Sequence, residues 1–251
     1  MLKFFRRIRL KLLDKGNLKR YLIYAFGEIL LVVIGILIAL QVNNLNENRK
    51  IRVNEGRLLN DLIIEIEDDF KSINYNIARH SEAMNSCKVL LDIFNKNIDY
   101  NDSLSFHLAA VHYYTVFISN MGAYESLKSK GFETISNKEL RFEIINLYEK
   151  WYPILRNNDN ILSEDIFHIK RNFNQTHFDK FQLFEVIPEG FRYNGEMIPN
   201  NFNQLKNNAE YKYFLKSLLA SHSSVISLNR LINKKAENVI DKSRVEIQKL
   251  K

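Results

Sequence analysis

The stretch YLIYAFGEILLVVIGILIALQVNN, residues 21–44, decides the first feature of the fold because it is apolar over the length of a bilayer. As far as residue 42 its strongly polar side chains are Glu28 and Gln41, and residues 29–40 are apolar on every face of a helix. About 20 such residues, rising about 1.5 Å each, cross roughly 30 Å of hydrocarbon. The sequence therefore predicts a transmembrane helix at 21–44, since a helix in a soluble core keeps a polar stripe for its surface.

The flanks of this helix predict its orientation. Eight Lys and Arg residues lie in residues 1–20, against four in residues 43–62. By the positive-inside rule the N-terminus stays in the cytoplasm and residues 45–251 are translocated. The apolar run is too long for the core of a cleavable signal, and LQVNNLN offers no small-x-small cleavage site, which favours an uncleaved signal anchor.

The charge of the chain belongs to the membrane flank. The formal net charge is +7, and the eight basic residues of 1–20 with the single acid Asp14 account for all of it. The rest of the chain is near neutral, so we expect no nucleic-acid partner. Residues 1–20 form either a basic amphipathic helix on the anionic inner leaflet or a disordered positive flank.

The remainder predicts an all-α domain at 45–251, since 8 Gly and 3 Pro leave few turn residues for strands. Two stretches carry a 4,3 rhythm of apolar positions, which predicts a long heptad or coiled-coil helix after the span and an antiparallel partner from about Asn208 to Lys251. Whether the first seam packs within the chain or between chains is left open by its periodicity. The seam positions are Leu59, Ile63, Ile66, Phe70, Ile73, Ile77, His80, Met84, Cys87, Leu91 and Phe94, and Leu215, Leu218, His222, Val225, Asn229, Ile232, Ala236 and Val239.

This pairing would bring His80 and His222 within a turn or two of each other. A metal-binding or proton-sensing histidine pair is one interpretation, because imidazole ligates zinc or copper and titrates near neutral pH. Two unrelated polar seam residues are the favoured interpretation, because no further ligand stands at suitable spacing. We therefore expect no metal and no cofactor, and a single cysteine, Cys87, that fills the helix seam.

The middle of the domain carries explicit helix signals. Gly131 in LKSKGF is typical of a helix stop, and ISNKEL predicts a capping box with Ser136 as N-cap and Glu139 three residues on. The helix that follows would bury Leu140, Ile144, Leu147, Trp151 and Ile154 and would kink or end at Pro153, before a further helix from about Asn160 to Phe178. The aromatic group His112, Tyr113 and Tyr114 is interpreted as core residues with one end exposed to solvent, or else as the lining of a ligand pocket.

After these helices, VIPEGFRYNGEMIPNN gathers two prolines and the turn pairs PEG and NG into one loop, or a short hairpin. Long loops often carry binding function, so Phe191, Arg192 and Tyr193 are candidate partner contacts.

No enzyme signature occurs in the sequence: it contains no G-x-G-x-x-G, P-loop, H-E-x-x-H, G-x-S-x-G or kinase motif. The carboxylates of EIEDDF (Glu65, Glu67, Asp68 and Asp69) lie beside seam positions and are interpreted as a solvated helix face. We expect that the protein is not an enzyme.

The segments FFRRIR, YLIYAFGEILLVVIGILIALQVNN and AYESLKSKGF...ISNKEL...YEKWYP together resemble a large family of single-pass membrane proteins in Gram-negative bacteria, classed as a domain of unknown function. The resemblance covers nearly the whole chain, and its most specific part is GEILLVVIGILIALQ. It implies an inner-membrane location and a helical domain, and it carries over no activity, cofactor or catalytic residue.

These observations leave three functional hypotheses. The first is a membrane-anchored periplasmic interaction or scaffold protein that binds the bilayer and either a second copy or another inner-membrane protein. The others are a ligand-sensing helical bundle and an accessory subunit, each acting through a separate membrane partner.

Within the span, Glu28 shares a helix face with Gly35 and Ala39, a small-xxx-small step at which two helices can approach closely. That face predicts a helix contact. The alternative is that Tyr21 and Tyr24 mark the interface and Glu28 lies at a shallow depth, near headgroups and water.

Overall fold

The computed structural model describes residues 18–187 and 190–250, without the side chains of residues 18, 20, 21, 24 and 183–194. The basic segment predicted at 1–20 and the interfacial role predicted for Tyr21 and Tyr24 therefore fall almost wholly outside the described part. The chain divides into two compact units, Met1–Asn54 and Glu55–Lys251.

In the first unit, helix α2 (Leu18–Asn95) begins. Every side chain of residues 29–53 is exposed. Within the described residues, α2 is the one helix long and apolar enough to span a membrane, with a mean hydropathy of 2.5 over its best window.

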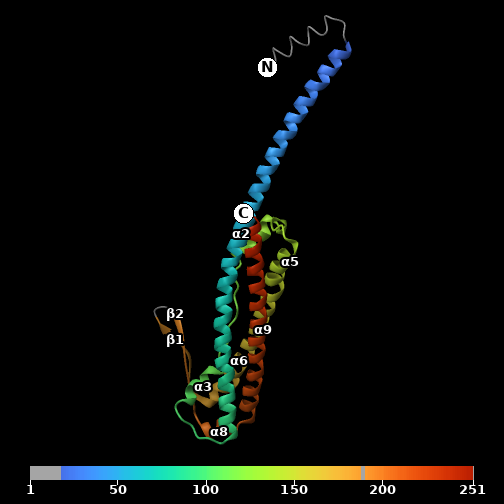
Figure 1. Cartoon of the computed structure of the whole chain (residues 1–251). Helices are drawn as coiled ribbons and strands as arrows, with labels where there is room; N and C mark the ends of the chain where they lie inside the picture. The colour runs from blue at the N-terminus through green and yellow to red at the C-terminus, as the bar shows by residue number, and fades with distance from the viewer. Residues whose placement is uncertain (1–17, 188–189, 251) are drawn as a thin grey trace. The chain divides into compact units, whose positions relative to one another are not determined.

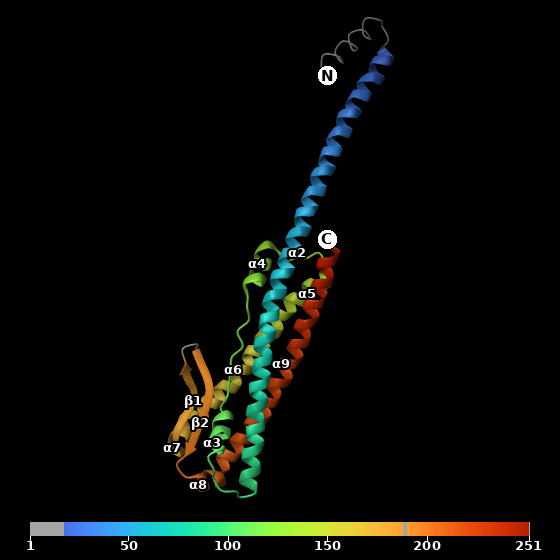
Figure 2. The same cartoon turned by 60° about the vertical axis from the view of Figure 1, so that its left-hand side comes forward.

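In the second unit, the later part of α2 and the C-terminal helix α9 (Ala209–Lys249) run in opposite directions. The contacts follow opposite sequence orders: Glu67 pairs with Arg244, and Asn74 bonds to Asn233. Figures 1 and 2 both place α9 beside α2 and beside α5 and α6, and α9 begins where α8 (Phe202–Asn207) ends.

Several predicted seam positions of α2 are buried within the second unit. Leu59, Ile66, Ile73 and Cys87 are fully buried by other parts of the same protein. The buried stripe is wider than the 4,3 rhythm, because several segments besides α9 pack on α2. The additional buried positions include Leu58, Leu62, Asp69, Asn76, Ala83, Ser86 and Leu90.

Helices α5 (Lys138–Asn146) and α6 (Tyr152–Ile169) form one continuous run, joined by the π-helical turn η2 (Leu147–Trp151). Pro153 lies in the first turn of α6 and does not end the run. The wider π turn shifts the inward face by one residue, so Tyr148, Tyr152 and Leu155 are buried. The prediction that Ile154 is a core residue is wrong, since it is 40% exposed.

The mostly helical architecture predicted from composition is confirmed, and a two-stranded antiparallel sheet adds to it. After α6 come a second π turn, η3 (Lys170–Asn174), and the short α7 (Gln175–His177). Strands β1 (Phe178–Ile187) and β2 (Gly190–Pro199) then pair as a hairpin next to α3. The all-α prediction is therefore corrected here, because aromatic and β-branched residues are dense enough in this segment to form strands.

Helix α3 (Leu104–Ala110) and helix α4 (Gly122–Lys130) are separated by an extended strap, residues 113–121. Gly131 ends α4 with φ of 90°, a conformation that favours glycine, before the 3-10 turn η1 (Phe132–Thr134). The predicted cap at Ser136 is wrong. Asn137 caps α5, its side chain accepting the backbone N–H groups of Glu139 and Leu140.

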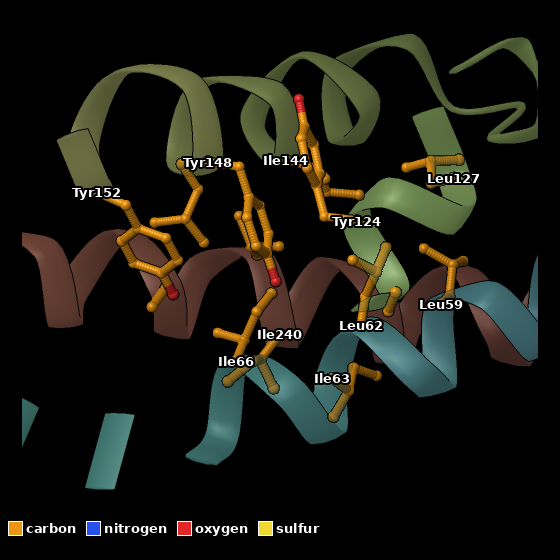
Figure 3. Close-up of a cluster of buried hydrophobic side chains, with 14 of the residues drawn as sticks. Leu59, Leu62, Ile63, Ile66, Tyr124, Leu127, Ile144, Tyr148, Tyr152 and Ile240 are labelled. Atoms are coloured by element: carbon orange, nitrogen blue, oxygen red, sulfur yellow. The ribbon is translucent and has the colours of Figure 1, made fainter. Parts of the chain in front are cut away.

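Two buried apolar clusters form the core of the second unit. In the first, Leu62 and Ile66 of α2 meet Tyr124 of α4, Tyr148 of η2 and Ile240 of α9 (Figure 3). The second cluster surrounds Cys87, Leu90 and Phe94 of α2 and includes α3, α8 and the start of α9.

Candidate functional site: a buried histidine centre

His80 of α2 and His222 of α9 meet in the interior. Their Nδ1 atoms are 3.0 Å apart, and both side chains are fully buried. The 4,3 spacing of both helices turns these positions inward, so the two imidazoles lie where apolar residues stand in neighbouring turns. The structure thus brings together the two histidines that the sequence placed within a turn or two of each other.

The surrounding acceptors assign the tautomers. His222 Nε2 lies 3.4 Å from the carbonyl oxygen of Val111, while His80 Nε2 is buried and has no hydrogen-bond partner among the described residues. A lone pair on His222 Nε2 would face the carbonyl lone pairs, so we assign the His222 proton to Nε2. His80 then carries its proton on Nδ1 and donates it to His222 Nδ1.

Both imidazoles are held neutral. Burial, together with the charge that His222 would carry, lowers the pKa of His80 from 6.5 to about 3. Burial lowers the pKa of His222 to about 4, against the opposing effect of the Val111 carbonyl. Protonation would place a charge in a low-dielectric interior with no described carboxylate paired to either ring.

Aromatic and cationic groups cover one side of the pair. The Tyr113 ring stands edge-on to His80 at 5.0 Å between centroids, and the Arg79 guanidinium lies 5.4 Å from the Tyr113 centroid. Burial raises the pKa of Tyr113 to about 12. The phenol therefore stays protonated and can donate to Asn76 Oδ1 at 3.4 Å.

A third histidine, His112, is also fully buried. Its Nδ1–H donates to the carbonyl of Leu108 at 3.0 Å, and its Nε2 accepts from the Asn174 amide at 3.0 Å. Burial lowers its pKa to about 4, opposed by the hydrogen bond to the Leu108 carbonyl. The sequence grouped His112 with Tyr113 and Tyr114 but gave no sign of Asn174, which is distant in the chain.

Carboxylates hold the strap and the start of α4 against the long helices. Asp159 of α6 accepts the Phe117 N–H and Asp69 of α2 accepts the Asn120 N–H, each at 2.9 Å. Burial raises the pKa of Asp159 to about 7 and that of Asp69 to about 6, and these hydrogen bonds oppose the shift. The interpretation of Asp69 as part of a solvated face is wrong, because the strap covers it and supplies its donors.

Glu65 and Glu55 extend this row of carboxylates. Glu65 accepts the Ala123 N–H at 2.8 Å at the start of α4, and Glu55 accepts the N–H and the hydroxyl of Ser136. Each satisfies backbone donors that a connecting segment would otherwise bury unpaired. The sequence signal for Glu65 was a group of four acids close to an apolar seam, and the sequence analysis did not single out Glu55.

Comparison with known proteins gives one match. The model of a family of unknown function, DUF6090, matches residues 28–187. The chain belongs to this family. The DUF6090 match includes His80 and His112 and ends before His222. No curated protein matches the chain, and no solved structure does.

The DUF6090 match also includes the predicted helix-contact face. Gly35 and Ala39 are exposed in α2, and Glu28, the first matched residue, is half-buried. A Cβ added at Gly35 would meet nothing within 4 Å in this chain. This face belongs to the first unit, and the histidine centre belongs to the second.

Beyond the DUF6090 match lies the third predicted site, at Phe191, Arg192 and Tyr193. These residues belong to β2, and their backbones pair with Val186, Glu185 and Phe184 of β1. The short hairpin predicted as the alternative to a loop is therefore confirmed, and the side chains of these three residues lie outside the described part. Among the described residues, no group of three or more His, Cys, Asp or Glu side chains is placed to hold a metal ion.

Proposed function

We propose that this chain is a membrane-anchored helical interaction protein. In this proposal residues 21–44 span the inner membrane of a Gram-negative bacterium as a signal anchor. Residues 1–20 lie on the cytoplasmic side, and residues 45–251 form a periplasmic domain that works through protein contacts and catalyses no reaction.

One observation carries the proposal: residues 29–40 are entirely apolar and every one of their side chains is exposed. Leu31 is 66% exposed and Leu37 is 58% exposed, on different faces of α2. An apolar surface on all sides of a helix needs a cover, since burial of each such side chain is worth about 1.5–3 kcal/mol. Lipid is the cover that fits a helix apolar all round.

The predicted orientation rests on the flanking Lys and Arg residues. Eight stand before the span and four after it. The resemblance to single-pass proteins supports the same orientation, with the helical domain translocated.

The interaction role rests on the span. Gly35 and Ala39 leave room for a second helix beside Glu28, which supports self-association or capture of another membrane protein through this face.

A ligand-sensing bundle or accessory subunit is the second candidate. The observation that favours it is a surface groove beside Trp151 in the folded domain. In that case the groove takes the ligand and the span contacts the partner that responds.

Crosslinking in intact membranes, followed by mass spectrometry, tests the proposal. Crosslinks between copies support a homo-oligomeric scaffold, and one recurrent membrane partner supports the accessory or sensing role. Recovery of the monomer alone, without a crosslink to another protein, contradicts the interaction role.

Orientation has its own test, since protease added to spheroplasts should degrade residues 50–251 and leave the N-terminal flank intact. Protection of residues 50–251 would overturn the proposed topology.

A further inference from the structure

A groove of about 540 Å³ lies on the surface of the second unit, between the α5–η2 run and α9. Its volume falls within the roughly 300–1,000 Å³ typical of sites for small organic ligands. We call it the Trp151 groove. It is lined by Glu139, Phe142, Glu143, Asn146, Leu147, Trp151, Leu231, Lys234, Lys235, Asn238 and Val239.

The floor and rim of the Trp151 groove are apolar. Leu147 and Val239 are buried at its base, while Phe142 is 66% exposed and Leu231 is 42% exposed at its edges. Large apolar side chains left open on both walls of a groove favour a ligand with an apolar body, because its binding would remove their surface from water.

The acidic end of the Trp151 groove is already neutralised. Lys242 lies 2.5 Å from a carboxylate oxygen of Glu139 and 2.8 Å from one of Glu143. Glu143 also accepts from the Asn238 amide at 2.9 Å. These carboxylates therefore have partners, and a ligand cation would have to displace Lys242.

The opposite end of the Trp151 groove carries unneutralised positive charge. The ammonium groups of Lys235 and Lys150 lie 4.8 Å and 5.0 Å from the centre of the Trp151 ring, and Lys234 lines the groove beside them. In the part of the chain that the structure describes, none of these three lysines forms an ion pair with a carboxylate. An anion bound beside the Trp151 ring would be attracted by these ammonium groups.

The backbone conformation beside Trp151 also indicates a functional site. Leu147 and Trp151 are the first and last residues of the π-helical turn η2. Such turns are rare and occur frequently at functional sites, since they alter which side chains a helix presents. Here the turn presents both residues to the Trp151 groove.

We propose that the Trp151 groove binds a small amphipathic carboxylate, a molecule with an aryl or alkyl body and one anionic headgroup. The apolar body lies along Phe142, Leu147 and Leu231, and the carboxylate meets Lys234 and Lys235 beside Trp151. This site goes beyond the proposed membrane role and does not depend on the span, so the two can fail separately.

Trp151 is the single tryptophan of the chain, so its fluorescence reports on this groove directly. The full chain in phosphatidylcholine vesicles is titrated with phenylbutyrate, with its uncharged amide phenylbutanamide and with the cation phenylbutylamine. The three share one apolar body. We expect a saturable change with phenylbutyrate at a Kd roughly tenfold lower than that of the amide, since charge-assisted contacts contribute about that factor.

Variants separate the contribution of charge to ligand affinity from the contribution of apolar contacts. The double variant Lys234→Gln with Lys235→Gln should bind phenylbutyrate no better than the amide. Lys216→Gln, an exposed lysine of α9 outside the groove, is the matched control and should bind like the unaltered chain. Leu231→Ser should weaken binding of carboxylate and amide alike, and far-UV circular dichroism verifies that each variant folds.

Three results would overturn the site: no saturable change with phenylbutyrate, equal binding of the amide, or full carboxylate affinity in the double lysine variant. None of these results bears on the crosslinking or the protease test of the membrane role.

Discussion

The ring of Tyr124 stacks on the ring of Tyr148 at 4.3 Å between centroids, with 5° between their planes. This contact joins α4 to η2 above the apolar residues of α2 (Figure 3). The two hydroxyls differ. Tyr124 donates to Glu149 Oε1 at 2.9 Å, whereas the Tyr148 hydroxyl is buried without a hydrogen-bond partner among the described residues.

Phenylalanine at each of these positions should therefore have opposite effects. Tyr124→Phe loses a hydrogen bond and should lower the free energy of unfolding by about 0.5–1.5 kcal/mol. Tyr148→Phe removes a buried unpaired hydroxyl and should leave the free energy of unfolding unchanged or raise it by up to about 1 kcal/mol. Urea unfolding of the full chain followed by circular dichroism measures both, and a larger loss for Tyr148→Phe would show that its hydroxyl is satisfied.

The histidine pair should behave as one unit. His222→Leu leaves the Nδ1–H of His80 buried without an acceptor, and should cost more than the double variant His80→Leu with His222→Leu. The double-mutant cycle should give a coupling of about 1 kcal/mol in unfolding experiments. Additive effects of the two single variants would contradict the tautomers assigned above.

The same histidines predict a pH dependence of stability. The pKa of His80 falls to about 3 and that of His222 to about 4 in the folded state. In acid the unfolded chain therefore binds more protons at these two histidines than the folded chain does. Their effect is absent above the unfolded pKa of about 6.5 and destabilises the fold as the pH falls from there toward about 4. The double leucine variant should lose less stability over this range, and an unchanged pH profile would refute the burial argument.

Asp159 predicts a pH dependence of stability with the opposite sign. Its pKa is raised from 3.8 to about 7, so the folded state holds a proton that the unfolded chain releases, and stability is lost as the pH rises through that range. Asp159→Asn keeps an acceptor for the Phe117 N–H and should stabilise the fold at about pH 8 more than at about pH 5. Asp159→Leu removes the acceptor and should cost about 1–3 kcal/mol at either pH.

Two substitutions test the helix-contact face of the span. A Cβ added at Gly35 meets nothing within 4 Å among the described residues, so we expect a loss of crosslinking in Gly35→Leu to arise at the contact with a neighbouring molecule. Glu28→Leu should also weaken crosslinking while membrane insertion stays intact. Ile36→Leu, of equal size on an adjacent face, is the control, and unchanged crosslinking in both test variants would remove this face from the proposal.

The inward face of α9 followed from the sequence, because a seam of apolar residues leaves little choice about which face turns inward, whereas four predicted seam positions of α2 are only partly buried: Phe70, Ile77, Met84 and Leu91. All eight positions predicted for the seam of α9 are buried, from Leu215 to Val239. The proximity of His80 and His222 followed from the same periodicity. These are local patterns, repeated over many turns.

The parts that depend on partners distant in the chain could not be predicted. The strap at 113–121 is extended because Asp69 and Asp159 accept its N–H groups. The sequence of the strap itself does not indicate those acceptors. Ser136 is a good cap by composition, yet Glu55 takes its hydroxyl and Asn137 caps α5 instead. The Trp151 groove needs both α5 and α9, so neither segment alone indicates it.

The π-helical turn between α5 and α6 has an evolutionary consequence. It accommodates one residue more than a regular turn, and each residue rotates a helix by about 100°. A relative lacking one residue between Leu147 and Trp151 could form an uninterrupted α-helix with the same buried face after it. A single-residue gap at this point would therefore mark relatives that keep the core and lose the shape of the groove.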